Sequence, residues 1–301
     1  MRKANILLIG ANGYIGSNVY KTLIALGASV TPVDNYSRND LDKQTDSDVL
    51  ITSYQNLKPE FLDRFTDCLW LAGHSSVQMS IKDEHGALRN NLYDLIAFSN
   101  LFRGRLIYAS SGSVYSRENA EISSELSPLN VPTNIYDYTK VSFDNYIRAT
   151  GKKAIGLRFG TVNGGSARIR KELMINSMAL KAMEEGSLWC SNESASRSIL
   201  FIDDLVRALV AILESDIDDG IFNLASFNMT VGQIASEVAR FTNCEIKRKP
   251  DSPTYNFIMN TELFEKTFNF AFDGDIEKII QSILLDHRKT RRRYGEATQR
   301  G

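Results

Sequence analysis

Two side chains that could act together in proton transfer, Tyr136 and Lys140, stand four residues apart in a segment whose pattern predicts a helix over residues 136–149. Residues four apart lie on the same face of a helix. An ammonium group beside a phenol stabilises the phenolate, so this spacing predicts that the pKa of Tyr136 falls from about 10 toward neutrality. Tyr136 would then serve as a general acid or base.

A run of serines lies upstream of this pair, in Ala109-Ser110-Ser111-Gly112-Ser113, directly after a predicted strand at residues 105–109. Open α/β sheets bind their ligands at the carboxyl ends of the strands. One of these hydroxyls could therefore hydrogen-bond the substrate oxygen that Tyr136 deprotonates. An ordinary serine turn is the alternative.

A glycine-rich loop, Gly10-Ala11-Asn12-Gly13-Tyr14-Ile15-Gly16, stands between a predicted strand at residues 5–9 and a predicted helix at residues 14–26. A pyrophosphate binds backbone N–H groups at a helix N-terminus, and a Cβ would block that approach. Asp34, which ends a second predicted strand at residues 28–33, is placed to accept hydrogen bonds from ribose hydroxyls. This favours NAD over NADP, although Arg38 could neutralise the 2′-phosphate of NADP.

The elements that must position these residues alternate along the first half of the chain. Apolar runs at residues 48–52, 68–72 and 153–159 are separated by helical patterns at 58–65 and 83–102, which predicts an α/β fold with a Rossmann-type, doubly wound parallel sheet. The later pattern is mixed, with helices expected at 171–185, 203–213 and 230–241 and a strand at 220–224. We expect a dinucleotide-binding domain at residues 1–160 and 198–224, and a smaller mixed α/β substrate lobe at 161–197 and 225–285.

Composition and charge exclude several classes of protein. The 301 residues include 35 basic and 36 acidic side chains, and no apolar run reaches the ~20 residues that a membrane-spanning helix needs. We therefore expect no membrane insertion and no nucleic-acid partner. Three scattered cysteines predict neither a disulfide framework nor a metal site and favour the cytoplasm. The basic segment 286–301 is expected to be a flexible, solvated tail, with binding to nucleic acid or a membrane surface as the alternative.

In this order and spacing, the segments GANGYIG, VDNYSR, LAGHSSV, YASSGSVY, the Tyr136–Lys140 pair and LRFGTVNG resemble the extended short-chain dehydrogenase/reductase superfamily. Within it, the chain resembles the NAD-dependent nucleotide-sugar epimerase/dehydratase family over about residues 4–285. The resemblance implies NAD as the cofactor and a nucleotide sugar as the substrate. It also implies a homodimer formed through the helices at 83–102 and 136–149.

The resemblance also implies roles for individual residues. Tyr136 would be the catalytic acid/base, Lys140 would hold the nicotinamide ribose, and Asn91 would support the nearby strands. The catalytic set would be Ser111, Tyr136 and Lys140. The cofactor would be bound by these two last residues and by Gly10, Asn12, Gly13, Tyr14, Ile15, Gly16, Asp34, Asn35, Arg38, Leu71, Ala72 and Gly73. The substrate would be bound by Ser75, Ser111, Ser113, Arg168, Arg170 and Arg197, with Arg197 gripping the pyrophosphate through its guanidinium fork.

Departures from the family pattern narrow the expected reaction. The 4,6-dehydratases of the family place an acidic residue two positions after the residue that matches Ser111, where this chain has Ser113. We therefore expect epimerisation, in which a hydride goes to NAD and returns to the other face of a keto sugar, rather than dehydration. One alternative is a reductase of a nucleotide-linked keto sugar, with His74 as a candidate acid. Another is a catalytically silent NAD-binding regulatory protein. Thr161 and the segment 163–165 also depart from the family pattern, so the substrate pocket is expected to differ from that of the hexose epimerases.

Overall fold

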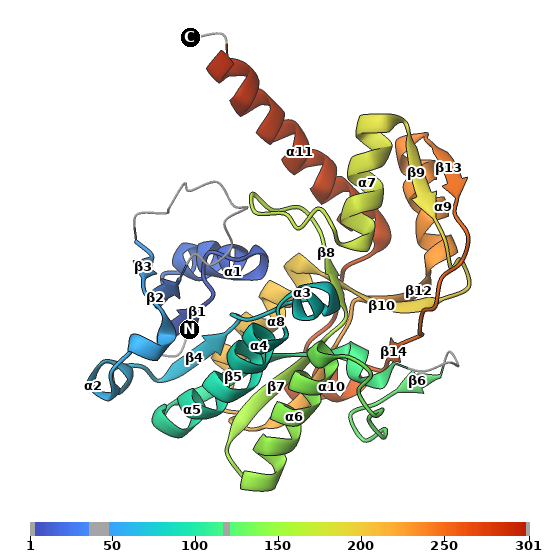
Figure 1. The fold of residues 1–301 in the computed structure, drawn as a ribbon. Helices are drawn as coiled ribbons and strands as arrows, with labels where there is room; N and C mark the ends of the chain where they lie inside the picture. The colour runs from blue at the N-terminus through green and yellow to red at the C-terminus, as the bar shows by residue number, and fades with distance from the viewer. Residues whose placement is uncertain (1–3, 36–47, 117–120, 299–301) are drawn as a thin grey trace.

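The structure, a computed structural model, describes residues 4–35, 48–116 and 121–298, with side chains up to residue 288. In these ranges seven strands form one sheet in the order β11-β7-β5-β4-β1-β2-β3 (Figure 1). Every neighbouring pair in this sheet is parallel. Its strands are β1 (Asn5–Ile9), β2 (Ser29–Asp34), β3 (Leu50–Ile51), β4 (Asp67–Trp70), β5 (Arg105–Ser111), β7 (Ala154–Phe159) and β11 (Gly220–Leu224). The predicted doubly wound parallel sheet is confirmed.

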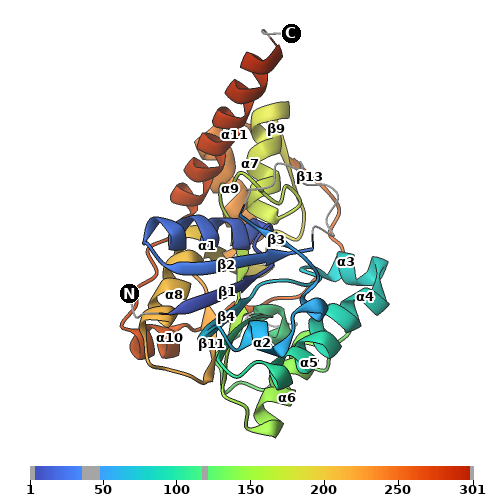
Figure 2. The same ribbon diagram turned by 90° about the vertical axis from the view of Figure 1, so that its left-hand side faces the viewer.

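The apolar strands bury side chains on both faces of this sheet, as a parallel sheet covered by helices requires. In β1, Ile6 and Leu8 belong to one hydrophobic core, whereas Leu7 and Ile9 belong to a second core on the opposite face. The first core includes residues of α1 (Tyr14–Ala25) and α8 (Ile202–Glu214), and the second includes residues of α5 (Asp94–Leu101) and α6 (Ile135–Thr150). Figure 2 shows these two layers of helices on either side of the strands.

The connection from β4 to β5 is helical but not one continuous α-helix. Where the pattern predicts a single helix over residues 83–102, the structure has α4 (Glu84–Leu88), a π-helical segment η2 (Arg89–Tyr93) and α5. Short elements complete this half of the chain: η1 (Tyr54–Asn56), α2 (Pro59–Leu62), α3 (Val77–Lys82) and η3 (Gly112–Tyr115). A π-helical turn within a helix is rare and often marks a functional site.

Segments from the second half of the chain, together with β6, build a smaller set of elements beside the carboxyl edge of the main sheet (Figure 1). Its small sheets, as far as the chain is described, have the orders β12-β10-β8, β13-β9 and β14-β6. The strands are β6 (Ile122–Ser123), β8 (Thr161–Asn163), β9 (Ser187–Cys190), β10 (Ser196–Phe201), β12 (Phe227–Thr230), β13 (Glu245–Arg248) and β14 (Ile258–Met259). The helices are α7 (Met174–Glu185), α9 (Val231–Thr242) and α11 (Ile276–Thr298), whereas α10 (Glu262–Phe268) packs against β11 of the main sheet. The division into two domains stays a prediction, and β10 pairs with β8 and β12 rather than with the main sheet.

The C-terminal segment, which the sequence predicts to be a flexible tail, is helical in the part that the structure describes, and its flexibility stays a prediction. Helix α11 continues through residue 286 to Thr298 and extends away from the body of the molecule (Figure 1). Its first turns are anchored by the buried side chains of Ile279, Ile280 and Ile283. The lysines, arginines and leucines that follow have high helix propensity, so a helix nucleated by packing can propagate through them. Among the described helices, none has both the length and the apolar character needed to cross a bilayer.

Candidate active site

The glycine-rich loop connects β1 to α1 and needs glycine for close backbone approach. The N–H groups of Gly10 and Ala11 both donate to the carbonyl of Val33 at the end of β2, at 2.9 and 3.2 Å. Gly10 has φ +89°, and a Cβ there would lie 2.7 Å from the backbone nitrogen of Ala72. A Cβ on Gly16 would overlap the carbonyl oxygen of Gly10. The helix therefore begins against the sheet at Gly13, which has no side chain to cap its first N–H groups.

Asp34 closes the other side of this loop. It ends β2, and its Oδ2 accepts a hydrogen bond of 2.8 Å from the backbone N–H of Asn12. Asp34 and Asn35 line the same cavity as the glycines, which places a carboxylate where the sequence predicts an adenosine ribose. Arg38, because of which NADP remained an alternative cofactor, lies outside the described residues.

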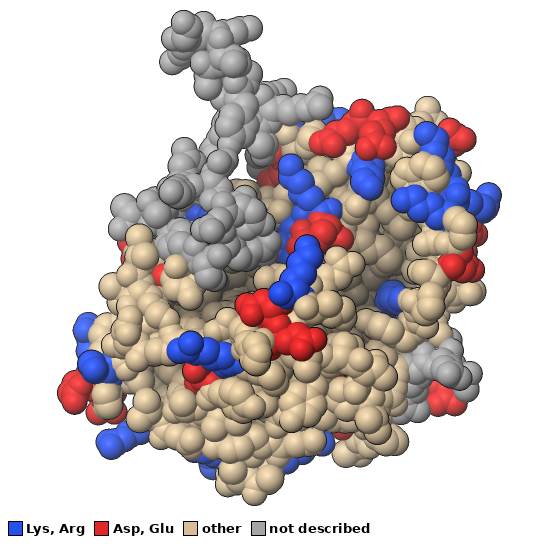
Figure 3. Space-filling model, in the orientation of Figure 1, with Lys and Arg blue, Asp and Glu red and all other residues tan. Residues whose placement is uncertain are grey.

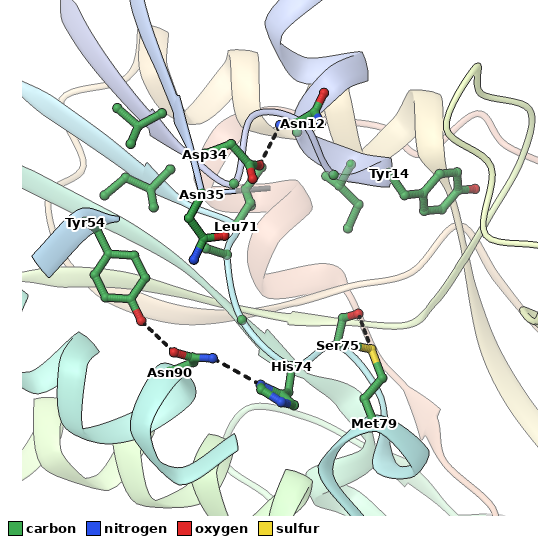
Figure 4. Close-up of a pocket in the computed structure, with 18 of the residues that line it drawn as sticks. Asn12, Tyr14, Asp34, Asn35, Tyr54, Leu71, His74, Ser75, Met79 and Asn90 are labelled. Atoms are coloured by element: carbon green, nitrogen blue, oxygen red, sulfur yellow. Dashed lines mark hydrogen bonds between the residues drawn. The ribbon is translucent and has the colours of Figure 1, made fainter. Parts of the chain in front are cut away.

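The glycine loop and the loop after β4 enclose a cavity of about 310 Å³. Most of the predicted cofactor residues line it: Gly10, Asn12, Gly13, Tyr14, Ile15, Gly16, Asp34, Asn35, Leu71, Ala72 and Gly73. Tyr54 and Asn90 also line it but belong to no motif that the sequence offers. The Tyr54 hydroxyl donates to Asn90 Oδ1 at 2.9 Å, and Asn90 Nδ2 lies 3.4 Å from His74 Nδ1 (Figure 4).

His74 is held through both nitrogens of its ring. Its Nδ1 lies beside Asn90, and its Nε2 is 3.1 Å from Asp83 Oδ2. These contacts orient the ring, which lines both cavities, and its role as a candidate acid for a reductase stays a prediction. Asn91 holds the same loop, because its Oδ1 accepts from the His74 N–H at 2.8 Å and its Nδ2 donates to the His74 carbonyl and to Thr139 Oγ1 of α6. The structure thus ties the π-helical segment to the catalytic helix through Asn91.

A second cavity of about 260 Å³ adjoins the first, and Tyr14, Ile15, the segment 71–75 and Arg170 line both. Ser111, Ser113, Tyr136 and Lys140 all line this second cavity. Figure 3 shows a hollow on this face of the molecule with charged side chains along its rim. The residues that the sequence places in the catalytic set are therefore brought to one cavity at the carboxyl edge of the sheet.

The electrostatics of Tyr136 and Lys140 differ from the expectation. Burial raises the pKa of Tyr136 to about 12, with the nearby Asp137 carboxylate acting in the same direction and the Arg170 guanidinium against it. Burial lowers the pKa of Lys140 to about 8. The predicted fall of the Tyr136 pKa is wrong for this structure. Lys140 Nζ lies 5.7 Å from the centre of the Tyr136 ring and donates instead to the Ala109 carbonyl, at 2.8 Å.

A carboxylate lies behind the serines, where the sequence indicates none. Ser111 Oγ and Ser113 Oγ are 2.8 Å apart, and the Ser113 hydroxyl donates to Asp137 Oδ1. Asp137 is 5% exposed and follows Tyr136 on α6. Position 113 itself carries a serine, yet the first turn of α6 supplies a carboxylate to it. Only the three-dimensional pairing of η3 with the start of α6 reveals this contact.

The three predicted substrate arginines have different environments. Arg170 is 9% exposed and lines both cavities. Its Nε donates to Glu172 Oε1 at 2.8 Å and its Nη1 to the Ser75 carbonyl at 3.3 Å, while its buried Nη2 has no hydrogen-bond partner among the described residues. Arg168 is described by the structure but stands outside the lining of both cavities.

Arg197 is also outside the lining of the cavities and is engaged by the segment that precedes β14. It donates to Thr254 Oγ1 at 2.6 Å and to the carbonyl of Tyr255, and its guanidinium lies over the Tyr255 ring. Tyr255 and Phe257 in turn line the second cavity. Arg197 therefore positions two aromatic residues of the site. These aromatics lie more than 100 residues after Tyr136 and belong to no recognisable motif.

The site as a whole fits a dinucleotide. At the glycines of the loop, a Cβ would fill space that the backbone leaves empty. The N-terminus of α1 and Asp34 line the first cavity, and Lys140 lines the adjoining second cavity. Backbone donors at a helix start suit a pyrophosphate, and an acidic residue at the end of the second strand suits the ribose hydroxyls of NAD. NAD would thus be held by the predicted residues, with its nicotinamide end toward Tyr136.

Comparison with known proteins agrees with this geometry. The profile of the NAD dependent epimerase/dehydratase family matches residues 6–225. The ADP-L-glycero-D-manno-heptose-6-epimerase of Brachyspira hyodysenteriae is 26% identical over 278 residues, which cover 82% of this chain and 85% of that protein. The UDP-glucose 4-epimerase of Corynebacterium glutamicum is 26% identical over 248 residues, 73% of this chain and 75% of that protein.

Solved structures share the fold. An NAD-dependent NDP-hexosamine 5,6-dehydratase has a TM-score of 0.83 and 21% identity, covering 95% of this chain and 98% of that one. The UDP-glucose 4-epimerase of Thermotoga maritima, solved with UDP-glucose, has a TM-score of 0.81 and 22% identity, covering 95% and 99%. Epimerases and dehydratases thus both occur on this fold.

Proposed function

The chain belongs to the NAD-dependent epimerase/dehydratase family, and from this premise we propose that it is a nucleotide-sugar epimerase that passes through a transient keto sugar. The observation that supports the proposal best is the shared cavity of Ser111, Tyr136 and Lys140, which adjoins the dinucleotide cavity. Gly112 and Ser113 leave no carboxylate on the strand end itself, so an elimination has no directly placed second base.

Each residue of the set has a separate task in this proposal. Tyr136, as the phenolate, takes the proton of the sugar hydroxyl that is oxidised and returns it when the keto sugar is reduced, and Ser111 hydrogen-bonds the same region of the sugar. Lys140, held by the Ala109 carbonyl, carries the positive charge at the nicotinamide end of the site. Bound NAD supplies the acceptor and the later donor of a hydride. Aromatic walls from Tyr255 and Phe257 exclude water from the sugar.

Arg170 is our candidate for recognition of the anionic part of the nucleotide sugar. It is buried, lies where the two cavities meet and carries an Nη2 group with no hydrogen-bond partner in the described structure. A buried donor without a partner costs about 1–3 kcal/mol, more for a charged group, and a phosphate or carboxylate oxygen would satisfy it. Arg170 thus replaces Arg197 as the arginine that we expect to contact substrate directly.

The test is to establish whether NAD is retained and which sugars are converted. Freshly purified protein is examined for bound NAD by native mass spectrometry, and a panel of nucleotide hexoses is then followed by NMR. We expect retained NAD, isomerised sugar and no net change in NADH. Tyr136→Phe is expected to lower the rate at least about 10³-fold while NAD is retained.

Other outcomes point to other functions. NADH consumed in proportion to a nucleotide-linked keto sugar would make the protein a reductase. Turnover of a hexose to a product that has lost water would make it a dehydratase. If Tyr136→Phe left the cellular function intact, the protein would be a catalytically silent NAD-binding regulator. Each of these results contradicts the proposed epimerase.

A further inference from the structure

The hydrogen bonds around Asp137 determine which atoms of the serine pair can donate. Asn134 Oδ1 accepts the backbone N–H of Asp137 at 2.9 Å, as the N-cap of α6. This contact fixes the orientation of the Asn134 amide, so its Nδ2 donates to Asp137 Oδ2 at 2.7 Å. The other carboxylate oxygen, Oδ1, accepts from the Ser113 hydroxyl. An ionised carboxylate has only acceptors, so the hydrogens of Asn134 Nδ2 and of the Ser113 hydroxyl both point toward the Asp137 carboxylate.

The donor in the hydrogen bond between Ser113 and Ser111 follows from these contacts. A hydroxyl has one hydrogen, and that of Ser113 is used by Asp137. The contact of 2.8 Å between the two serine oxygens must therefore use the hydrogen of Ser111. Ser111 Oγ also receives the Ser113 backbone N–H at 3.3 Å. Neither serine has a hydrogen left for a ligand, although both line the second cavity.

We propose that Asp137, acting through Ser113, makes this serine pair a hydrogen-bond acceptor toward the sugar, so that the site selects a nucleotide sugar presenting neutral hydroxyl groups there. A keto oxygen or a uronate carboxylate at the same position would face lone pairs only. A uronate would also face the buried negative charge of Asp137, which is 5% exposed. Such unpaired acceptors and like charges are the usual means by which a site rejects a competing ligand.

The inference deepens the proposed function and rests on it for the identity of the ligand. A substrate that enters as an alcohol donates its hydroxyl hydrogen to an acceptor, as an epimerase substrate does. A substrate that enters as a ketone needs a donor, which this serine pair lacks. Asp137 is thus a positioning residue that favours the hydroxyl form of the sugar over the keto form in the resting site.

Tyr136 reports on this direction without any sugar present. A hydrogen bond from Ser111 lowers the pKa of Tyr136, because it stabilises the phenolate. When the Ser111 hydrogen is directed to Ser113, Ser111 gives less of this stabilisation, and freeing that hydrogen should lower the pKa of Tyr136 further. The charged or titratable groups that act on Tyr136 are Lys140 and Asp137 on its own helix, Arg170 from the loop before α7, and Tyr255 from the segment before β14. A change of hydrogen-bond direction should therefore shift the titration of Tyr136 even when all these charges are kept.

Two variants distinguish the effect of hydrogen-bond direction in the serine pair from the effect of the Asp137 charge. Ser113→Ala keeps the Asp137 charge but frees the Ser111 hydrogen. Asp137→Asn removes the charge and also reverses the direction, because Asn134 Nδ2 must still meet an oxygen and the new amide N–H₂ then faces Ser113. The control is Ser110→Ala, since the buried Ser110 hydroxyl has no hydrogen-bond partner among the described residues.

The experiment places 3,5-difluorotyrosine at position 136 of the NAD-loaded protein and follows its titration by ¹⁹F NMR, because the fluorinated phenol titrates where the protein stays folded. We expect the midpoint to fall by about one pH unit in Ser113→Ala and by more in Asp137→Asn. Ser110→Ala should titrate as the parent does. A fall in Asp137→Asn with no change in Ser113→Ala would overturn the proposal, because charge alone would then explain it.

A second measurement tests selection of the sugar. In a Tyr136→Phe background that prevents turnover, UDP-glucose is expected to bind at least tenfold more tightly than UDP-glucuronate, and Asp137→Asn should reduce that ratio at least tenfold. An unchanged ratio would contradict the proposal. If the titrations behave as expected but no nucleotide sugar binds, the proposed function fails while the hydrogen-bond direction stands.

Discussion

Burial controls the protonation of two residues in this site, Tyr136 and Lys140. Lys140 stands four residues after Tyr136, yet its ammonium group donates to the Ala109 carbonyl and does not lower the pKa of the tyrosine. Burial disfavours the charged form of both groups, which raises the pKa of Tyr136 and lowers that of Lys140. A helix pattern predicts which side chains share a face, but the degree of burial depends on the loops that close over that face.

The buried ammonium of Lys140 should make the folded protein less stable at neutral pH. Its pKa is about 8 when folded and about 10.4 when unfolded. Between these values the unfolded chain binds more protons, so the free energy of unfolding rises with pH. We expect Lys140→Met to raise the free energy of unfolding at pH 7 by about 2 kcal/mol, after the loss of one hydrogen bond, while turnover is lost. Chemical denaturation at pH 7 and pH 10 measures this.

The matched control is Lys21→Met, which removes an exposed lysine from α1 and should change the free energy of unfolding by less than about 0.5 kcal/mol. The gain from Lys140→Met should shrink as the pH rises from 8 to 10. A lower free energy of unfolding of Lys140→Met at pH 7 would contradict this prediction, because contacts in the folded protein would then more than offset the cost of burying the Lys140 ammonium.

Arg170 and Arg168 form a natural pair for a binding test, because they are two residues apart and only Arg170 is among the residues that line the cavities. We expect Arg170→Met to weaken binding of the converted nucleotide sugar by about 10- to 100-fold, which corresponds to about 1.4–2.8 kcal/mol. Retention of NAD should change little. Isothermal titration of the two variants checks this, and equal effects of Arg168→Met and Arg170→Met would remove Arg170 from the site.

At the scale of elements, the sequence predicts best what depends on neighbours in the chain. The strand–glycine loop–helix unit at residues 5–26 is a local pattern, and its residues line the expected cavity. Asp137 and Ser113, Arg197 and Tyr255, and Tyr54 and Asn90 are pairs from separate elements. The spacing of these residues does not indicate how α6 contacts η3, or that the segment before β14 pairs alongside β10. The sequence therefore indicates the loop residues that line the cavities, but not the contacts between separate elements that complete the site.

The turn between β1 and α1 offers a direct test at this scale. A methyl group on Gly16 would overlap the Gly10 carbonyl, whereas on Gly13 the nearest atom would be the same oxygen at 3.3 Å. We expect Gly16→Ala to lower NAD affinity at least about 100-fold, since the turn must open and the N–H groups of α1 move away from the pyrophosphate. Gly13→Ala should destabilise the fold less than Gly16→Ala.

Thermal unfolding with and without NAD measures both effects. The parent protein should gain stability on adding NAD, because a ligand that binds only the folded state raises its stability by mass action. At the same NAD concentration Gly16→Ala should gain less, by up to about 2.7 kcal/mol for a 100-fold weaker affinity. A variant that retained NAD as the parent does would show that the turn accommodates a side chain and that the pyrophosphate lies elsewhere.

At the scale of the whole molecule, the face formed by α5 and α6 differs from the rest of the surface. Charged side chains are sparse over the lower front of the molecule, where these helices lie (Figures 1 and 3). Tyr93, Ala97 and Leu101 are exposed and follow one another at intervals of four, which puts them on one side of the helix. On α6, the side chain of Tyr138 is also exposed. Such an apolar stripe suits an isologous interface between two copies of the chain.

We therefore expect a homodimer joined through α5 and α6, as the family resemblance also implies. Leu101→Glu should convert it to a monomer, because a carboxylate would be buried against its symmetry mate. Leu26→Glu is the matched control, since Leu26 on the opposite layer is 52% exposed and Leu101 is 50% exposed. Light scattering after size exclusion should give twice the chain mass of 33.8 kDa for the parent and the control. A monomeric parent would mean that there is no such interface, and a dimer that persists in Leu101→Glu would place the interface elsewhere.

Because Asn91 and Thr139 connect this face to the loop at His74, loss of the dimer is expected to raise KM for the sugar as well.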